Sequence, residues 1–278
     1  MPRLKSKKTD ALISGPTEEV KKEKTKYSEQ DFTDLALLTE STVDELKEEF
    51  FLYYTRKFMS KVVKVVTRYA VSDIELEKIF VDADKLNVGG VMLPHVYLSS
   101  ARKIKLKNKL ENVKLFSIVD FPFGESSFKS KITGVRDGAR FGVSETTVMT
   151  ASVLMSEENK RVLKSESVKF GRRGNVGLAL NATDLDFSAI ERAVKIFNKT
   201  KLPFITFVFG DASLEEVKNK LEIISKAKCN KKICVLANVD SADSVTELKK
   251  LGVDRVFTPY ADLIASAMIK RFKIEKVN

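Results

Sequence analysis

The chain has 278 residues, of which 43% are hydrophobic and 31% are charged, a balance typical of a soluble globular protein with a sizeable core. Its formal net charge is +11, a sign that suits anionic partners such as nucleic acid, a membrane surface or phosphorylated metabolites. No run approaches the ~18 consecutive apolar residues of a membrane span, so we expect no membrane insertion. The first residues lack the apolar core of a signal peptide. Two cysteines, Cys229 and Cys234, exclude a disulfide framework, and we expect a reducing, cytoplasmic location.

The first 27 residues are polar and lysine-rich, contain Gly15 and Pro16, and show no apolar period. We expect a disordered basic tail over residues 1–27. The rest of the basic excess is spread along the chain. This basic excess indicates either a solvated basic surface or a surface that binds nucleic acid weakly and without sequence preference. The sequence contains no recognition motif that would favour a specific nucleotide sequence.

Short apolar, β-branched runs alternate with longer amphipathic segments over the rest of the chain. The predicted strands, in chain order, are residues 35–38, 88–93, 113–119, 146–154, 176–180, 204–209, 233–237 and 253–257. From the third strand onward the starts are separated by roughly 20–35 residues, the length of one strand–helix unit.

The segments between these runs carry helix-start signals. Capping boxes of the type Ser/Thr-x-x-Glu are predicted to begin at Thr42, Ser72, Ser188 and Ser213, and Asn238 is predicted to open a further helix. The first helix is predicted over residues 43–70, with Phe58, Val62 and Val65 on one face together with other aromatic residues. Its aromatic surface exceeds what one barrel face needs, so we expect it to make a partner or self-association contact.

Eight strands that alternate with helices predict a parallel sheet. Their number and the length of chain favour a (β/α)8 TIM barrel over residues 28–278. An open doubly wound sheet usually begins with a Gly-rich turn after its first strand, and the sequence has none. We therefore predict an α/β fold of the TIM-barrel class preceded by the basic tail.

Two isolated features have open interpretations. His95 is the only histidine, which excludes multi-histidine metal sites, and it is either catalytic or merely exposed. The turn Gly171-Arg-Arg-Gly174 is either an anion cradle or a simple basic turn. We expect no metal site and no cofactor.

The predicted third strand and the residues that follow it resemble a known protein family. Val119-Asp-Phe-Pro-Phe-Gly124, followed by Lys131 and then by Gly142-Val-Ser-Glu145, resembles the third strand, the Phe-Pro-x-Gly turn and the fourth-strand opening of the deoxyribose-phosphate aldolases. Residues 176–210 resemble the fifth strand, helix and sixth strand of that family. Leu251-Gly-Val-Asp-Arg255 is similar to the approach to its eighth strand, and Asp34-Leu-Ala-Leu-Leu38 to its first strand.

The resemblance implies a Schiff-base aldolase, yet the residues for that chemistry are replaced. The family's Schiff-base lysine falls at Thr206, and the second lysine, which tunes the first, falls at Leu236. The aspartate of the fourth strand falls at Thr147, and the phosphate-binding Ser-Ser-Gly after the eighth strand falls at 259–261. A hydroxyl cannot form an iminium ion, and an alkyl side chain cannot tune an amine. The sequence therefore predicts no catalytic residues of the family type.

Polar residues remain near the predicted strand ends, and they form either a ligand pocket for a neutral polyol or residual polarity satisfied by water. The candidate pocket residues are Asp34, Asp120, Asn181, Thr206, Asn238 and Thr258.

Three functions stay open on the sequence alone. The first, which we favour, is an aldolase-like barrel without Schiff-base activity that acts by binding or assembly. The second is an active lyase on 2-deoxyribose 5-phosphate or a related sugar phosphate, with a relocated nucleophile. The third is a basic nucleic-acid-binding accessory protein.

Overall fold

The computed structural model describes residues 33, 35, 36, 42–66 and 71–275. The chain divides into two compact units, Met1–Leu52 and Tyr53–Asn278, and the second contains every strand. The predicted tail, 1–27, and Asp34 lie outside the described residues. No described helix is long and apolar enough to cross a membrane.

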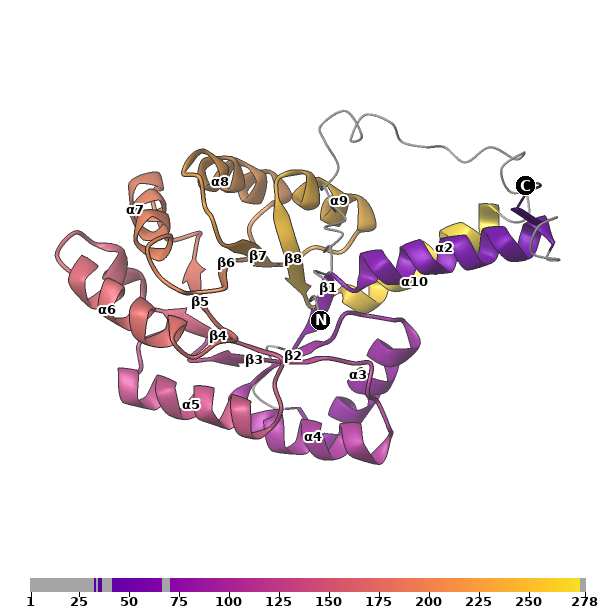
Figure 1. Cartoon of the computed structure of the whole chain (residues 1–278), viewed down its shortest axis with the longest axis horizontal. Coiled ribbons are helices and arrows are strands. Elements are labelled where there is room, and N and C mark those ends of the chain that lie inside the picture. The colour runs from indigo at the N-terminus through magenta and orange to yellow at the C-terminus, as the bar shows by residue number, and fades with distance from the viewer. Residues whose placement is uncertain (1–32, 34, 37–41, 67–70, 276–278) are drawn as a thin grey trace, which may run out of the picture. The chain divides into compact units, whose positions relative to one another are not determined.

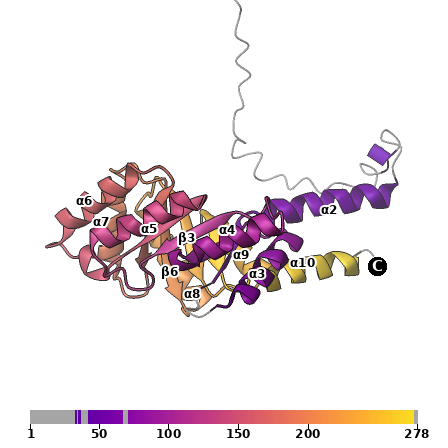
Figure 2. The same ribbon diagram turned by 90° about the horizontal axis from the view of Figure 1, so that it is seen from below.

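Eight parallel strands close into a barrel in the order β1 to β8, which confirms the predicted (β/α)8 fold. Figure 1 shows the strands in the middle of the second unit with helices around them, and Figure 2 shows α3 to α9 flanking the strands from another side. The strands are β1 (Val62–Val65), β2 (Val91–Pro94), β3 (Leu115–Val119), β4 (Glu145–Thr150), β5 (Val176–Asn181), β6 (Phe204–Gly210), β7 (Lys232–Ala237) and β8 (Val253–Thr258).

A helix follows each strand. The α-helices of the described chain are α2 (Val43–Met59), α3 (Asp73–Lys85), α4 (Leu98–Lys107), α5 (Phe128–Arg140), α6 (Lys160–Gly171), α7 (Phe187–Phe197), α8 (Leu214–Lys226), α9 (Ala242–Lys250) and α10 (Ala261–Glu275). Short 3-10 helices, η1 (His95–Tyr97) and η2 (Ser152–Met155), follow β2 and β4.

The first strand is not where the sequence pattern puts it. The strand predicted at 35–38 is wrong, because Leu35 and Ala36 are helical. The helix predicted over 43–70 is also wrong beyond Met59, since β1 begins at Val62. Adjacent β-branched valines favour an extended chain. They pair with both β2 and β8 and so close the barrel.

Two of the predicted helix caps also move. Helix α7 is capped by Asp186, whose carboxylate accepts from the Ala189 backbone N–H at 2.6 Å, and not by Ser188. Helix α9 is capped by Ser241 rather than Asn238. The capping boxes at Thr42 and Ser72 are confirmed by reciprocal hydrogen bonds with Glu45 and Glu75.

The side chains that point into the barrel form a hydrophobic cluster separate from the main core. Its buried apolar residues are Val63, Val65, Met92, Phe116, Ile118, Met149, Ala179, Phe204, Val208, Cys234, Leu236 and Phe257. Toward the N-terminal ends of the strands, Arg255 pairs with Glu145, and its guanidinium carbon lies 4.9 Å from the ring centroid of Phe116. The barrel is thus filled by side chains and is not a channel.

Candidate functional site

The positions that the resemblance assigns to catalysis lie in the barrel interior. Thr206 alternates along β6 with Phe204 and Val208, which both belong to the interior cluster, and Leu236 belongs to the same cluster on β7. Thr147 lies two residues before the interior residue Met149 on β4. Because side chains alternate between the two faces of a strand, all three positions face inward.

These inward positions are closed to solvent. Thr206 is 0% exposed, Thr147 is 1% exposed and Leu236 is 5% exposed. Toward the C-terminal ends of the strands, buried Met149 and Val208 follow the two threonines on the same strands. Within the described residues, the hydroxyls of Thr147 and Thr206 have no hydrogen-bond partner. Among the described residues, neither threonine is hydrogen-bonded to a base that could activate its hydroxyl.

Four of the predicted pocket residues use their polar atoms within or between the loops at this end of the barrel. Asp120 accepts from the Ser126 backbone N–H at 2.9 Å and from the Ser126 hydroxyl at 2.6 Å. Thr258 donates to the Val239 carbonyl at 2.6 Å. Asn181 accepts from the Thr183 hydroxyl at 2.8 Å and donates to Asp184, and Asn238 donates to Asp211. The first and third sets of bonds hold the loops after β3 and β5, and the others join the end of β8 and the loop after β6 to the loop after β7.

Lys131 is a buried lysine beside this end of the barrel, and sequence reasoning missed its burial. It lies in the second turn of α5, its side chain is 2% exposed, and its ammonium donates to the Gly124 carbonyl at 2.7 Å. Its Nζ lies 3.7 Å from Oδ2 of Asp120, whose side chain is 15% exposed. The pair joins α5 to the turn that carries the Phe-Pro-x-Gly sequence. The apolar neighbours Phe128 and Ile132 on the same helix were the available signal.

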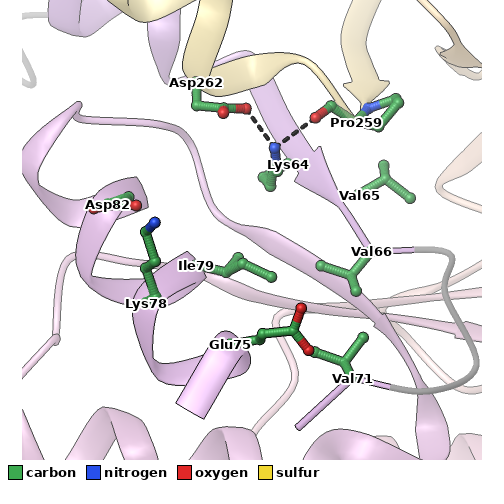
Figure 3. A pocket seen from close by; sticks show the side chains of 10 residues that line it. All are labelled: Lys64, Val65, Val66, Val71, Glu75, Lys78, Ile79, Asp82, Pro259 and Asp262. Carbon is green, nitrogen blue, oxygen red and sulfur yellow. Dashed lines mark hydrogen bonds and ion pairs between the residues drawn. The ribbon is translucent and has the colours of Figure 1, made fainter. Parts of the chain in front are cut away.

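A second lysine, Lys64, lines a cleft on the outer face of the barrel. The cleft has a volume of about 380 Å³ between β1, α3 and the start of α10 (Figure 3). Val63 and Val65 face the interior, so Lys64 between them points outward, where its ammonium donates to Asp262 and to the Pro259 carbonyl. An ammonium held by two oxygen acceptors has no lone pair for attack on an aldehyde. The misplaced first strand hid this residue from sequence reasoning.

His95 and the Gly171–Gly174 turn have separate places. His95 begins η1 after β2 and is partly exposed. The basic turn follows α6 and precedes β5, so it lies at the N-terminal ends of the strands, whereas TIM-barrel active sites lie at the C-terminal ends. It is therefore not part of the candidate site.

The closed interior predicts unequal cysteine reactivity. Burial raises the pKa of Cys234 to about 12, and the thiol is 1% exposed on the inner face of β7. Burial also raises the pKa of Cys229, which is only partly buried. Since the thiolate is the reactive form, we expect iodoacetamide near pH 8 to modify Cys229 slowly and to leave Cys234 intact until the protein is unfolded. Peptide mass spectrometry checks this order, and rapid native labelling of Cys234 would contradict a closed interior.

Comparison with solved structures places the fold. The chain superposes on an aldolase designated QR15 with a TM-score of 0.69 and 20% identity, over 78% of this chain and 98% of that one. It superposes on the tetrameric deoxyribose phosphate aldolase from Aeropyrum pernix with a TM-score of 0.67 and 15% identity, over 78% and 93% of the two chains. The fold is that of the deoxyribose-phosphate aldolases. No protein-family model and no curated protein matches the sequence itself.

The fold indicates the end of the barrel at which a site is expected. In a TIM barrel of this type the reacting groups stand at the C-terminal ends of the strands. In this chain that region holds buried Val208 and Leu236, hydrogen-bonded polar side chains and the Asp120–Lys131 pair, and Thr206 lies two residues before Val208 within β6.

Proposed function

We propose that this chain is a deoxyribose-phosphate-aldolase-like barrel that has lost Schiff-base activity and acts by binding or assembly. The observation that carries the proposal is the burial of Thr206, which is 0% exposed and places a hydroxyl at the position that the resemblance assigns to the Schiff-base lysine. Leu236, at the position of the tuning lysine, faces the same interior and packs there as an apolar residue. Neither position supplies an amine, and both side chains are buried among the described residues.

The charge at the C-terminal ends of the strands also disfavours a sugar phosphate. The segments that follow β5, β6 and β7 (182–190, 211–217 and 238–245) contain seven acidic residues and no lysine or arginine. After β8, where the family's phosphate-binding serines are expected, Pro259 accepts from Lys64 through its carbonyl and Tyr260 is 38% exposed. The acidic side chains of these segments disfavour a phosphate dianion, and Lys131 and Lys220, which reach this end of the barrel, already donate to backbone carbonyls.

The alternative, a lyase with a relocated nucleophile, needs a free amine near the same end. Lys131 and Lys64 already donate to carbonyl and carboxylate oxygens. Lys220 on α8 donates to the carbonyls of Ala182, Thr183 and Leu185 in the β5–α7 connection. The ammonium groups of these lysines stabilise loops by hydrogen bonding, so the non-catalytic proposal is better supported than the alternative.

An activity assay tests the proposal. We expect the protein neither to cleave 2-deoxyribose 5-phosphate nor to join acetaldehyde to an aldehyde phosphate, because the amine and its tuner are absent. The assay follows acetaldehyde release with an active aldolase of this fold as positive control. Substrate turnover that survives further purification, and scales with the concentration of this protein, would contradict the proposal.

Self-association through α2 is the form of assembly that we propose. Tyr53 and Tyr54 are 58% and 46% exposed, and their rings pack edge to face at 5.4 Å. Exposed aromatic side chains of this size commonly mark interfaces. We expect light scattering to show an oligomer that Tyr53→Ser weakens. Phe187→Ser is the matched control, because Phe187 is 54% exposed on α7. A monomer at high concentration, or equal weakening by both variants, would contradict an α2 interface.

A further inference from the structure

The three connections that lead into β5, β6 and β7 form a continuous basic surface at the N-terminal end of the barrel. We call it the basic arc and define it as residues 168–175, 194–203 and 223–232. It contains ten lysines and arginines and no acidic residue. The sequence analysis expected a spread excess of charge; the fold instead gathers these residues at one end of neighbouring strands, because each connection precedes a strand of one parallel sheet.

Direct contacts show that the basic arc is one surface. The Asn198 side chain donates to the Lys228 carbonyl at 3.0 Å and accepts from the Asn230 backbone N–H at 3.0 Å. Gly171 lies so close to the next connection that a Cβ there would stand 3.0 Å from the Lys201 carbonyl carbon. Lys231 donates to the Thr200 carbonyl at 2.7 Å. The three basic connections are therefore held side by side.

Most of these cationic side chains form no hydrogen bond, ion pair or ring contact within the described part of the chain. Lys169, Lys195 and Lys226 lie in last helical turns, where a cation complements the helix dipole. The helix dipole does not explain the basic residues that lie beyond the helix ends. Among them, hydrogen bonds, ion pairs and ring contacts with described residues are absent for the exposed side chains of Arg172, Arg173, Lys199, Lys201, Lys228 and Lys232.

We propose that the basic arc binds the phosphate backbone of double-helical nucleic acid without reading its sequence. Fixed cations on one surface neutralise phosphates and release counterions, and this supplies non-specific affinity. The opposite ends of β5, β6 and β7 are acidic, so a polyanion approaches from the basic end. Acidic neighbours of the basic arc include Glu191, which pairs with Lys195 at 3.0 Å, and Asp254, which accepts from the Ile233 backbone N–H at 2.9 Å.

The side chains of the basic arc favour a duplex over other anionic partners. Single strands are usually bound on exposed aromatic rings, and membrane surfaces by basic residues combined with apolar anchors. The large exposed apolar side chains of the described residues include none in the basic arc. Several of them, such as Val96, Phe123, Val153 and Phe187, follow strands at the other end of the barrel. Charge without stacking or insertion groups suits a phosphate backbone.

Fluorescence anisotropy with labelled DNA and RNA duplexes of about 20 base pairs, over a range of NaCl concentrations, tests the proposal. We expect affinities that are similar for unrelated sequences and fall steeply with salt. The triple variant Arg172→Ser, Arg173→Ser, Lys201→Ser should bind at least about tenfold more weakly at low salt, and its salt slope should fall by about 1 for each lost contact.

The matched control is Lys129→Ser, Arg161→Ser, Lys164→Ser, which removes the same charge from exposed positions on α5 and α6 outside the basic arc. Its binding should change less than threefold, about the ordinary scatter of a surface change. An equal loss in both variants, salt-insensitive binding, or binding to phosphatidylserine vesicles without binding to duplexes would overturn the proposal. Circular dichroism verifies that both variants are folded.

Discussion

Thr206→Lys should destabilise the protein by about 3–5 kcal/mol without creating aldolase activity, because it places an unpaired ammonium in a closed interior. Thr206 is 0% exposed, and its apolar neighbours on the inner face include Val208 and Leu236. The described residues of the inner face include no carboxylate partner beside Thr206 and no tuning amine for a lysine there. Urea unfolding gives the loss in free energy, and the aldolase assay gives the activity.

Thr206→Val is the matched control at the same position. It keeps the shape of the side chain and removes a buried hydroxyl that has no hydrogen-bond partner among the described residues. We expect its unfolding free energy to be unchanged or to rise by about 1 kcal/mol. A large loss on Thr206→Val would show that the hydroxyl has a partner. A stable Thr206→Lys protein would show that the interior is open to water.

Lys131→Met should cost about 3–5 kcal/mol, because it removes one partner of a buried ion pair and leaves the other with its desolvation penalty. The substitution keeps an apolar chain of similar length but leaves the Gly124 carbonyl without its 2.7 Å donor and Asp120 without its cation. The β3–α5 turn should open first, so hydrogen exchange should rise there before the rest of the barrel. Urea unfolding and hydrogen exchange measure the two effects.

Lys129→Met is the control for Lys131→Met on the same helix. Lys129 is exposed, two residues earlier in α5, so its removal should change the unfolding free energy by less than about 0.5 kcal/mol. Equal effects of the two substitutions would contradict a structural role for the buried pair.

The alternation of strands and helices made most of the barrel predictable from the sequence. Seven of the eight predicted strands overlap the observed ones, because buried parallel strands are apolar, β-branched and bounded by helix caps. The first strand failed because Phe58, Val62 and Val65 also fit a helical spacing. The pairing of β1 with β2 and β8 decided the outcome, and such tertiary pairing is not visible in a local pattern.

The site was predictable in position and less so in its contacts. The inward direction of Thr206 and Leu236 follows from strand alternation. The burial of Lys131, the outward direction of Lys64 and the basic arc depend on which loops meet in space. A count along the chain mixes the basic segments before each strand with the acidic segments after it, so their separation to opposite ends of β5, β6 and β7 appears only in the fold.

Borohydride trapping followed by peptide mass spectrometry tests the loss of Schiff-base chemistry most directly. The protein is incubated with 2-deoxyribose 5-phosphate or acetaldehyde, and sodium borohydride then reduces any iminium ion to a stable amine. An active aldolase of the same fold, treated in parallel, should gain one adduct on its lysine. We expect this chain to show no substrate-dependent, site-specific adduct, because Thr206 has no amine and Lys64, Lys131 and Lys220 are engaged as ammonium donors. A single lysine labelled stoichiometrically and only with substrate would contradict the account and identify the nucleophile.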